Sequence, residues 1–193
     1  MSTEHQKRHR HAGRSSQSFL DPKAIIDALD LHPGNSVLDV GCGNGYVSLY
    51  AAAIVGQDGI VYAVDSDQRS IDSLQSTIGN KSLTNIIALR EDVTQGLSIA
   101  PHSIDICLMV NVFHGFVMND ELSDVFRFVN RVLKDQGKLV VVDFEKGKEI
   151  PGPPQEVRIA ISEAARILLR NGFDCRKNFS PGPYHYGLIF VKS

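Results

Sequence analysis

The chain has 193 residues, 42% of them hydrophobic and 22% charged, which is typical of one soluble globular domain with a sizeable core. A formal net charge of -2 gives no general reason to expect nucleic acid or an anionic membrane as a partner, and no apolar run approaches the roughly 20 residues that span a bilayer. The three cysteines, Cys42, Cys107 and Cys175, lie far apart and form no C-x-x-C pair, so we expect no metal site and no disulfide framework, in keeping with a reducing cytoplasm.

Residues 1–20 are polar and basic, with four Lys or Arg side chains against one Glu in the first 14 residues. They lack the apolar side chains that would pack on a core, and no apolar stretch marks a secretory signal. We therefore expect a flexible basic tail at 1–20 and a single domain at 21–193. Two alternatives for the tail stay open: a lid that closes over a ligand, and a weak metal site at its histidines.

The next segment predicts a short helix, a buried strand and a glycine turn. An apolar run over 36–40 predicts the strand, and Gly41, Gly43 and Gly45 follow it at alternate positions. A helix over 46–55 is expected directly after them. Glycines at such a turn let the backbone approach a ligand closely, and the start of the helix offers N–H groups to it.

Four more apolar runs predict strands that alternate with helices. The strands are expected over 60–64, 86–89, 104–110 and 138–144, and the helices between them over 67–80 and 119–133. Because the strands are apolar throughout, we expect a parallel sheet covered by helices on both faces. Right-handed crossovers then place the carboxyl ends of the strands at one edge, where ligands bind in open α/β sheets. The polar residues at those ends are Asp39, Asp65, Asp92, Asn111 and Asp143.

After the strand over 138–144 the alternation stops. A polar loop rich in Pro and Gly leads to a predicted helix over 160–171. Two strands then follow, over 173–179 and 186–191, with no helix between them. Strands joined without a helix form a hairpin, so we expect the sheet to end in an antiparallel strand.

The glycine turn and Asp65 together indicate a nucleotide-like ligand. Asp65 lies 24 residues after Gly41, close to the spacing of about 20 at which an acid after the second strand binds ribose hydroxyls. The dinucleotide fingerprint G-x-G-x-x-G fails, however, because its third glycine would fall on Tyr46. A nicotinamide-dependent oxidoreductase is therefore disfavoured, and it stays open as an alternative.

At these residues the chain resembles the class I S-adenosylmethionine (SAM)-dependent methyltransferases. The resemblance rests on four segments in order, VLDVGCGNG at 37–45, VYAVDSD at 61–67, REDV at 90–93 and RVLKDQGKL at 131–139. In the last segment Asp135 and Gln136 replace the Pro-Gly of the family. The most similar subtype is the small type 11 group, which includes quinone-biosynthesis enzymes. The resemblance implies a Rossmann-like α/β fold with a seven-stranded, mostly parallel sheet of order 3-2-1-4-5-7-6, its last strand antiparallel, and helices on both faces.

The resemblance also implies SAM as the cofactor and assigns roles around it. Asp65 would bind the ribose diol, Asp92 and the Val93 N–H would bind the adenine, and Asn111 would lie beneath the sulfonium. The backbone of the glycine turn would pass the methionine part, with Asp39 holding the turn and the amino group. The predicted cofactor-binding residues are Asp39, Gly41, Cys42, Gly43, Gly45, Asp65, Ser66, Glu91, Asp92, Val93 and Asn111.

Purely structural roles are the alternatives for several of these residues. Asp39 would cap the next helix, Asp65 would be a turn acid, and Asp92 would form an Asx-turn. Cys42 is expected to be a small buried filler, since a cysteine inside a glycine turn has little room to act.

The predicted activity is methyl transfer from SAM to a small molecule. Such a transfer needs positioning and exclusion of water, and it needs a general base only if the acceptor must lose a proton early. Weak catalytic candidates are His114, Asp143 and Arg158; the alternatives are helix-start packing for His114 and a solvated acid for Asp143.

The expected partners follow from the same reasoning. No separate acceptor-binding domain is visible in the sequence, so a small-molecule acceptor is expected rather than nucleic acid or a membrane. We expect a cytoplasmic monomer or homodimer. A non-catalytic module that only binds SAM is a further alternative, because residues on the cofactor side do not distinguish it from an enzyme.

Overall fold

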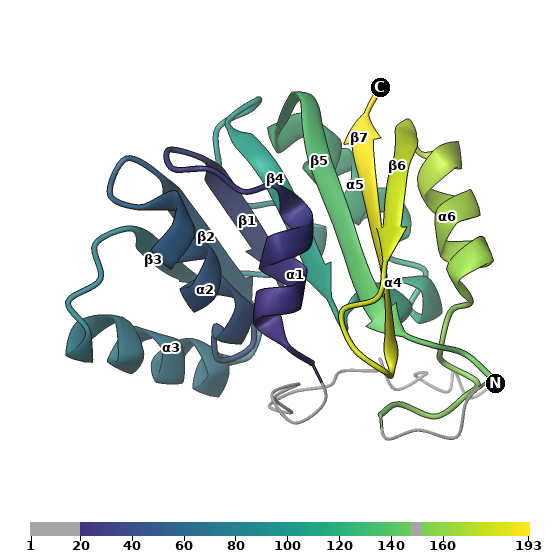
Figure 1. The fold of residues 1–193 in the computed structure, drawn as a ribbon, viewed down its shortest axis with the longest axis horizontal. Helices are drawn as coiled ribbons and strands as arrows, with labels where there is room; N and C mark the ends of the chain where they lie inside the picture. Colours follow the sequence, from purple (N-terminus) through teal and green to yellow (C-terminus); the bar gives the residue numbers. More distant parts are fainter. Residues whose placement is uncertain (1–19, 148–151) are drawn as a thin grey trace, which may run out of the picture.

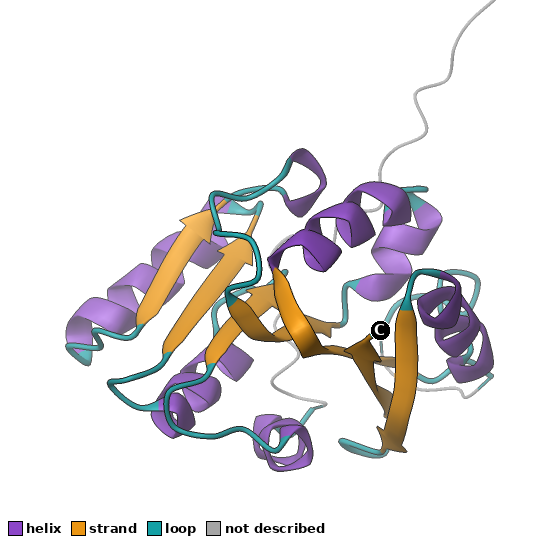
Figure 2. Ribbon diagram, turned by 90° about the horizontal axis from the view of Figure 1, so that it is seen from above, coloured by secondary structure: helices purple, strands orange, loops and turns teal. Residues whose placement is uncertain are grey.

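A computed structural model describes residues 20–147 and 152–193 and shows a central sheet (Figure 1) with helices on both of its sides (Figure 2). The strands are β1 (Ser36–Val40), β2 (Ile60–Asp65), β3 (Ile86–Arg90), β4 (Ile104–Val110), β5 (Leu133–Phe144), β6 (Phe173–Phe179) and β7 (His185–Lys192). The α-helices are α1 (Pro22–Leu29), α2 (Tyr46–Val55), α3 (Gln68–Asn80), α4 (Phe113–Met118), α5 (Leu122–Val132) and α6 (Ile161–Arg170). A 3₁₀ helix, η2 (Val93–Gln95), follows β3.

The strand order of the sheet is β3-β2-β1-β4-β5-β7-β6. The strands from β1 to β5 pair in parallel, and β7 runs antiparallel to both of its neighbours, β5 and β6. The predicted seven-stranded, mostly parallel sheet is confirmed. The carboxyl ends of β1 to β5 therefore share one edge, the lower edge in Figure 1.

Two apolar clusters, one on each face of the sheet, hold the helices in place. Helices α1, α2 and α3 contribute residues such as Ile25 and Leu74 to one cluster. Helices α4, α5 and α6 contribute residues such as Phe113 and Val129 to the other. Because the strands are buried by helices on both sides, their runs are apolar rather than alternating.

Local chemistry explains where several elements begin. The Asp21 side chain accepts a hydrogen bond from the Lys23 N–H at the start of α1, where Pro22 is the first helical residue. The Asp67 side chain caps α3 in the same way, by accepting from the Ser70 N–H at 2.9 Å.

Two elements differ from the prediction. Helix α4 has only six residues and no expected counterpart, and β5 begins at Leu133 rather than at 138. Leu133 pairs with Ile104 and Lys138 with Ile106, so β5 carries extra residues in a bulge. Gln136, one of the two residues that replace the Pro-Gly of the family, lies inside that bulge with a φ of 61°.

The predicted tail at 1–20 lies outside the described residues except for Leu20, which is buried in the cluster of α1 to α3. Within residues 20–147 and 152–193, no helix combines the length and apolarity needed to cross a bilayer. In the same described parts of the chain, no three His, Cys, Asp or Glu side chains gather in a way that would hold a metal ion.

Candidate functional site

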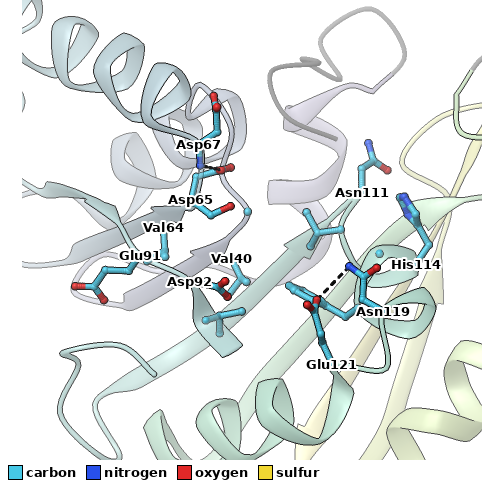
Figure 3. A pocket seen from close by; sticks show the side chains of 16 residues that line it. Val40, Val64, Asp65, Asp67, Glu91, Asp92, Asn111, His114, Asn119 and Glu121 are labelled. Carbon is cyan, nitrogen blue, oxygen red and sulfur yellow. Dashed lines mark hydrogen bonds between the residues drawn. The ribbon is translucent and has the colours of Figure 1, made fainter. Parts of the chain in front are cut away.

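A cavity of about 230 Å³ opens at the carboxyl edge of the sheet, where β1, β2, β3 and β4 end. Figure 3 shows that its labelled polar side chains form two facing groups. The first group, here the acidic wall, follows β2 and β3 and consists of Asp65, Asp67, Glu91 and Asp92. The second group, here the α4 wall, follows β4 and consists of Asn111, His114, Asn119 and Glu121.

The glycine turn between β1 and α2 reaches the cavity at Gly41, whereas Gly43 and Gly45 are not among the lining residues. Gly41, Gly43 and Gly45 have φ values of 71°, 55° and 80°, which favour glycine. A Cβ on Gly41 would clash with Val112, which also lines the cavity, and a Cβ on Gly45 would clash with Leu74 of α3. The space beside Gly43 is open. Gly41 therefore lets Val112 pack closely on the turn, whereas Gly45 serves the packing of α3.

Asp65 ties the glycine turn to the start of α3. Its Oδ2 accepts a hydrogen bond from the Gly43 N–H at 2.8 Å, and its Oδ1 accepts from the Asp67 N–H at 2.8 Å. Through these bonds Asp65 stabilises the turn, which is the structural role expected as the alternative to ligand binding. The carboxylate also lines the cavity, and each of its oxygens has a second lone pair for a ligand hydroxyl.

The segment after β3 places Glu91, Asp92 and Val93 in the cavity lining. Asp92 Oδ1 accepts from the Thr94 N–H at 3.0 Å and from the Thr94 hydroxyl at 2.7 Å, so Asp92 caps η2 in an Asx-turn. Glu91 Oε2 is buried and has no hydrogen-bond partner among the described residues. A ligand donor at that oxygen would remove a desolvation penalty of roughly 1–3 kcal/mol.

Asp39 and Cys42 lie behind the glycine turn and do not line the cavity. Asp39 is 2% exposed, and its Oδ2 accepts from the Ser48 hydroxyl of α2 at 2.6 Å. Burial raises the pKa of Asp39 to about 6, a shift that the Ser48 bond opposes. The Cys42 thiol lies 3.4 Å from the Gly43 carbonyl oxygen, and burial raises its pKa above the usual range. Cys42 is thus a buried filler.

Asn111 begins the α4 wall at the end of β4. Its φ of 59° is a left-handed conformation that asparagine adopts more readily than most residues. Its backbone N–H donates to the Val142 carbonyl at 2.8 Å, so the end of β4 stays attached to β5. Figure 3 shows Asn111 and His114 on the same side of the cavity, across from Asp65.

His114 and Asp143 form a buried pair between α4 and β5. Each side chain is 1% exposed. His114 Nδ1 lies 2.8 Å from Asp143 Oδ1 and 3.0 Å from Oδ2, and the His114 backbone N–H donates to Oδ2 at 3.0 Å. The alternative that Asp143 is a solvated acid is wrong, because the side chain is buried under α4. His114 lines the cavity, and Asp143 supports it from behind.

Arg158, the third catalytic candidate, does not line the cavity. Its guanidinium donates to the Pro153 carbonyl at 2.8 Å and to the Glu145 carbonyl at 3.2 Å, and it stacks 5.7 Å from the centre of the Phe144 ring. Burial lowers its pKa from the ordinary value. Arg158 therefore ties the segment after β5 to the sheet.

The part of the lining that follows His114 was not predicted from the sequence. Gly115 and Phe116 come from α4, while Asn119 and Glu121 come from the junction with α5. Asn119 Nδ2 donates to Glu121 Oε2 at 3.3 Å. Residues 119–121 were expected to start a helix. Only their position after the carboxyl end of β4 marked them as candidates for the site.

The charge of the lining is one-sided. Its titratable side chains are His114 and five carboxylates, and no Lys or Arg belongs to the described lining. The carboxylates are Asp65, Asp67, Glu91, Asp92 and Glu121. A lining with this charge attracts a cationic ligand and repels a pyrophosphate.

Comparisons with known proteins agree with this geometry. Residues 37–137 match the family model described as a methyltransferase domain. The solved structure of a SAM-dependent methyltransferase from Aquifex aeolicus is 25% identical, covers 94% of this chain and 95% of its own, and superposes with a TM-score of 0.84.

Two curated relatives match over shorter stretches. A protein-L-isoaspartate O-methyltransferase of Methanocella arvoryzae is 34% identical over 40% of this chain and 42% of its own length. A demethylmenaquinone methyltransferase of Desulfitobacterium hafniense is 26% identical over 64% of this chain and 48% of its own. The chain thus spans less than half the length of these curated relatives.

Proposed function

The chain belongs to the methyltransferase domain family, and from that premise we propose that it transfers the methyl group of SAM to a small-molecule acceptor. The predicted resemblance to SAM-dependent methyltransferases is confirmed by the family match and by the Aquifex structure, which covers nearly the whole chain. The observation within the site that carries the proposal is the acidic wall, which faces the α4 wall in a cavity whose described lining includes no Lys or Arg.

The lining fits SAM in both charge and hydrogen-bonding capacity. SAM carries an ammonium, a sulfonium and one carboxylate, so its net charge is positive, and it supplies a methyl group on an already activated leaving group. In this proposal Asp65 holds the ribose diol, Asp92 and the Val93 N–H hold the adenine, and the backbone at Gly41 passes the methionine part. The buried Glu91 Oε2 offers a further acceptor for a ligand N–H or O–H group.

A small acceptor is supported by the demethylmenaquinone methyltransferase among the curated relatives. One curated relative is named for a quinone acceptor, demethylmenaquinone, and another for an isoaspartate in protein, so relatives differ in what they methylate. The absence of nucleic-acid and membrane partners, the cytoplasmic location and the monomeric or homodimeric state stay predictions.

The two alternative functions differ in what they require of the site. A nicotinamide-dependent oxidoreductase must hold a pyrophosphate, which the five carboxylates of the lining disfavour. A module that binds SAM without turnover would use the same acidic wall and would differ only on the α4 wall.

Calorimetry with SAM and S-adenosylhomocysteine tests the proposal. We expect both to bind the wild-type protein, and Asp65→Ala to bind at least about tenfold more weakly, since a hydrogen bond to a charged group contributes roughly 1.5–3 kcal/mol. Asp58→Asn, in the exposed turn before β2, is the matched control and should bind as the wild type does. Failure of the wild type to bind either ligand, or binding of NADH in their place, would contradict the proposal.

A further inference from the structure

The His114–Asp143 pair has a geometry that bears on the chemistry of the unknown acceptor. We propose that His114 takes a proton from the acceptor during methyl transfer, so that the acceptor is a protic nucleophile with an O–H or N–H group at the reacting atom. This inference rests on the proposed function, which leaves the acceptor atom open. It assigns a catalytic role to His114 and a positioning role to Asp143.

The hydrogen bonds at Asp143 determine which ring nitrogen of His114 carries the proton. An ionised carboxylate only accepts hydrogen bonds, and three N–H donors converge on this one. Two are backbone groups, the His114 N–H at 3.0 Å and the Phe144 N–H at 2.8 Å. The third is Nδ1 of the His114 ring, at 2.8 Å from Oδ1. Nδ1 is therefore the donor, and the lone pair of the neutral ring is on Nε2.

The position of the ring suits a general base. His114 belongs to the α4 wall, and Figure 3 places it beside Asn111 and across the cavity from Asp65. The proposed ribose site and the imidazole thus lie on opposite walls, and in this proposal the acceptor lies on the α4 side. Asp143 is buried behind the ring, so its negative charge stabilises the imidazolium that forms when Nε2 takes a proton.

The step balances without any further reactant. The Nε2 lone pair takes the proton from the O–H or N–H group of the acceptor, and the electron pair left on that atom forms the new bond to the methyl carbon. The methyl–sulfur bond breaks with its electrons going to sulfur, which becomes neutral. The proton then leaves His114 for solvent, so one proton is released per methyl group transferred.

Glu121 is the other side chain on the α4 wall that can accept a proton. It differs from His114 in the hydrogen bond that orients it. It accepts from Asn119 Nδ2 at 3.3 Å, whereas the His114 ring is held by a buried carboxylate at 2.8 Å. The competing reading of the His114–Asp143 pair is that it only anchors α4 to β5. That reading predicts equal loss of activity toward all acceptors when His114 is replaced.

Nuclear magnetic resonance of ¹⁵N-histidine-labelled protein tests the tautomer without any acceptor. The chain has seven histidines, so the His114 signals are assigned by comparison with His114→Gln. We expect the neutral ring to carry its proton on Nδ1 rather than on Nε2, both alone and with S-adenosylhomocysteine bound. A neutral ring with its proton on Nε2 would overturn the proposal.

A pair of probe acceptors of the same shape separates a base from an anchor. The hydroxyl of 4-methoxyphenol keeps its proton at pH 8, whereas the thiol of 4-methoxythiophenol is largely ionised and needs no base. We expect His114→Gln to slow methyl transfer to the phenol by about 100-fold or more and to the thiol by only a few-fold, in line with the 10²–10⁴-fold contribution of general bases. Binding of S-adenosylhomocysteine should be unchanged.

His102→Gln is the matched control for this experiment. His102 also lies beside an aspartate, with Nδ1 3.7 Å from Asp135 Oδ1, but its side chain is 60% exposed and precedes β4 at the opposite edge of the sheet. Its rates with both probes should equal those of the wild type. Equal slowing of both probes by His114→Gln would overturn the role of His114 while leaving the proposed function intact. Absence of transfer to either probe and to a deproteinised small-molecule extract would overturn the proposed function itself.

Discussion

At the scale of single residues, Asp39 is a buried carboxylate that links the stability of the protein to pH. Its carboxylate lies beneath the glycine turn, 2% exposed, with the Ser48 hydroxyl as its hydrogen-bond donor. Burial raises its pKa to about 6, so the ionised form is disfavoured in the folded protein.

The stability of the protein should report this pKa. Between pH 4 and 6 the folded state binds more protons at Asp39 than the unfolded state, so this group's contribution to the free energy of unfolding falls as pH rises through that window. The free energy of unfolding of Asp39→Asn, measured relative to that of the wild type, should therefore rise by about 2 to 3 kcal/mol between pH 4 and pH 8. Urea unfolding at several pH values measures the difference, and a pH-independent difference would contradict the expectation.

The residue scale also shows which site residues a sequence reveals. Asp65, Asp92 and Asn111 were predicted because a polar residue at the end of an apolar strand can be recognised in the sequence. The structure brings all three to the cavity. Cys42 was included only because it lies inside the motif, and its side chain points into the core cluster. Their roles toward SAM stay predictions.

At the scale of elements, α4 is the piece that sequence reasoning did not find. It has six residues, too few to show an apolar period, and no side chain caps its start. It is held instead by long-range hydrogen bonds from His114 to Asp143, 29 residues later in the chain. Strands β1 to β4 were predictable from their apolar runs, whereas a helix held by a distant carboxylate was not.

Removing the Asp143 carboxylate should loosen α4. Asp143→Ala leaves three buried N–H donors without their acceptor, so we expect a loss of about 3 kcal/mol or more in the free energy of unfolding. Asp143→Asn keeps one acceptor oxygen, so its free energy of unfolding should fall by less. Denaturant unfolding gives the free energies, and hydrogen exchange at 113–118 should speed up in Asp143→Ala.

Asp135→Ala is the control for that experiment. Its side chain is 92% exposed in the β5 bulge, so the free energy of unfolding should change by no more than about 0.5 kcal/mol. An Asp143→Ala protein as stable as this control would show that the buried pair does not anchor α4.

At the scale of the whole molecule, the net charge of -2 conceals a local concentration of negative charge. Five carboxylates line the cavity at the carboxyl edge of the sheet, without a Lys or Arg among the described lining residues. Length and composition predicted an ordinary globular domain, and only the folded arrangement shows where the acids converge. The strand order brings β2 and β3 to one side of the cavity and β4 to the other.

This arrangement predicts a salt-dependent choice between the methyl donor and its product. SAM has a sulfonium that the product lacks, so the acidic wall should favour SAM over S-adenosylhomocysteine most strongly at low salt. Raising the ionic strength about tenfold shortens the Debye length from roughly 10 Å to 3 Å and should narrow the ratio of the two affinities. Calorimetry at the two salt concentrations measures the ratio, and a ratio that widens with salt would refute this electrostatic view.

The place of β7 in the sheet has a consequence for biosynthesis. Among the described strands β7 is the last to be made, yet it lies inside the sheet, between β5 and β6. While a ribosome is still producing residues 145–184, β5 presents an open edge along Lys138–Phe144, the stretch that later pairs with β7. Exposed strand edges invite pairing with other chains, so the nascent protein passes through a stage at which a chaperone has a defined edge to protect.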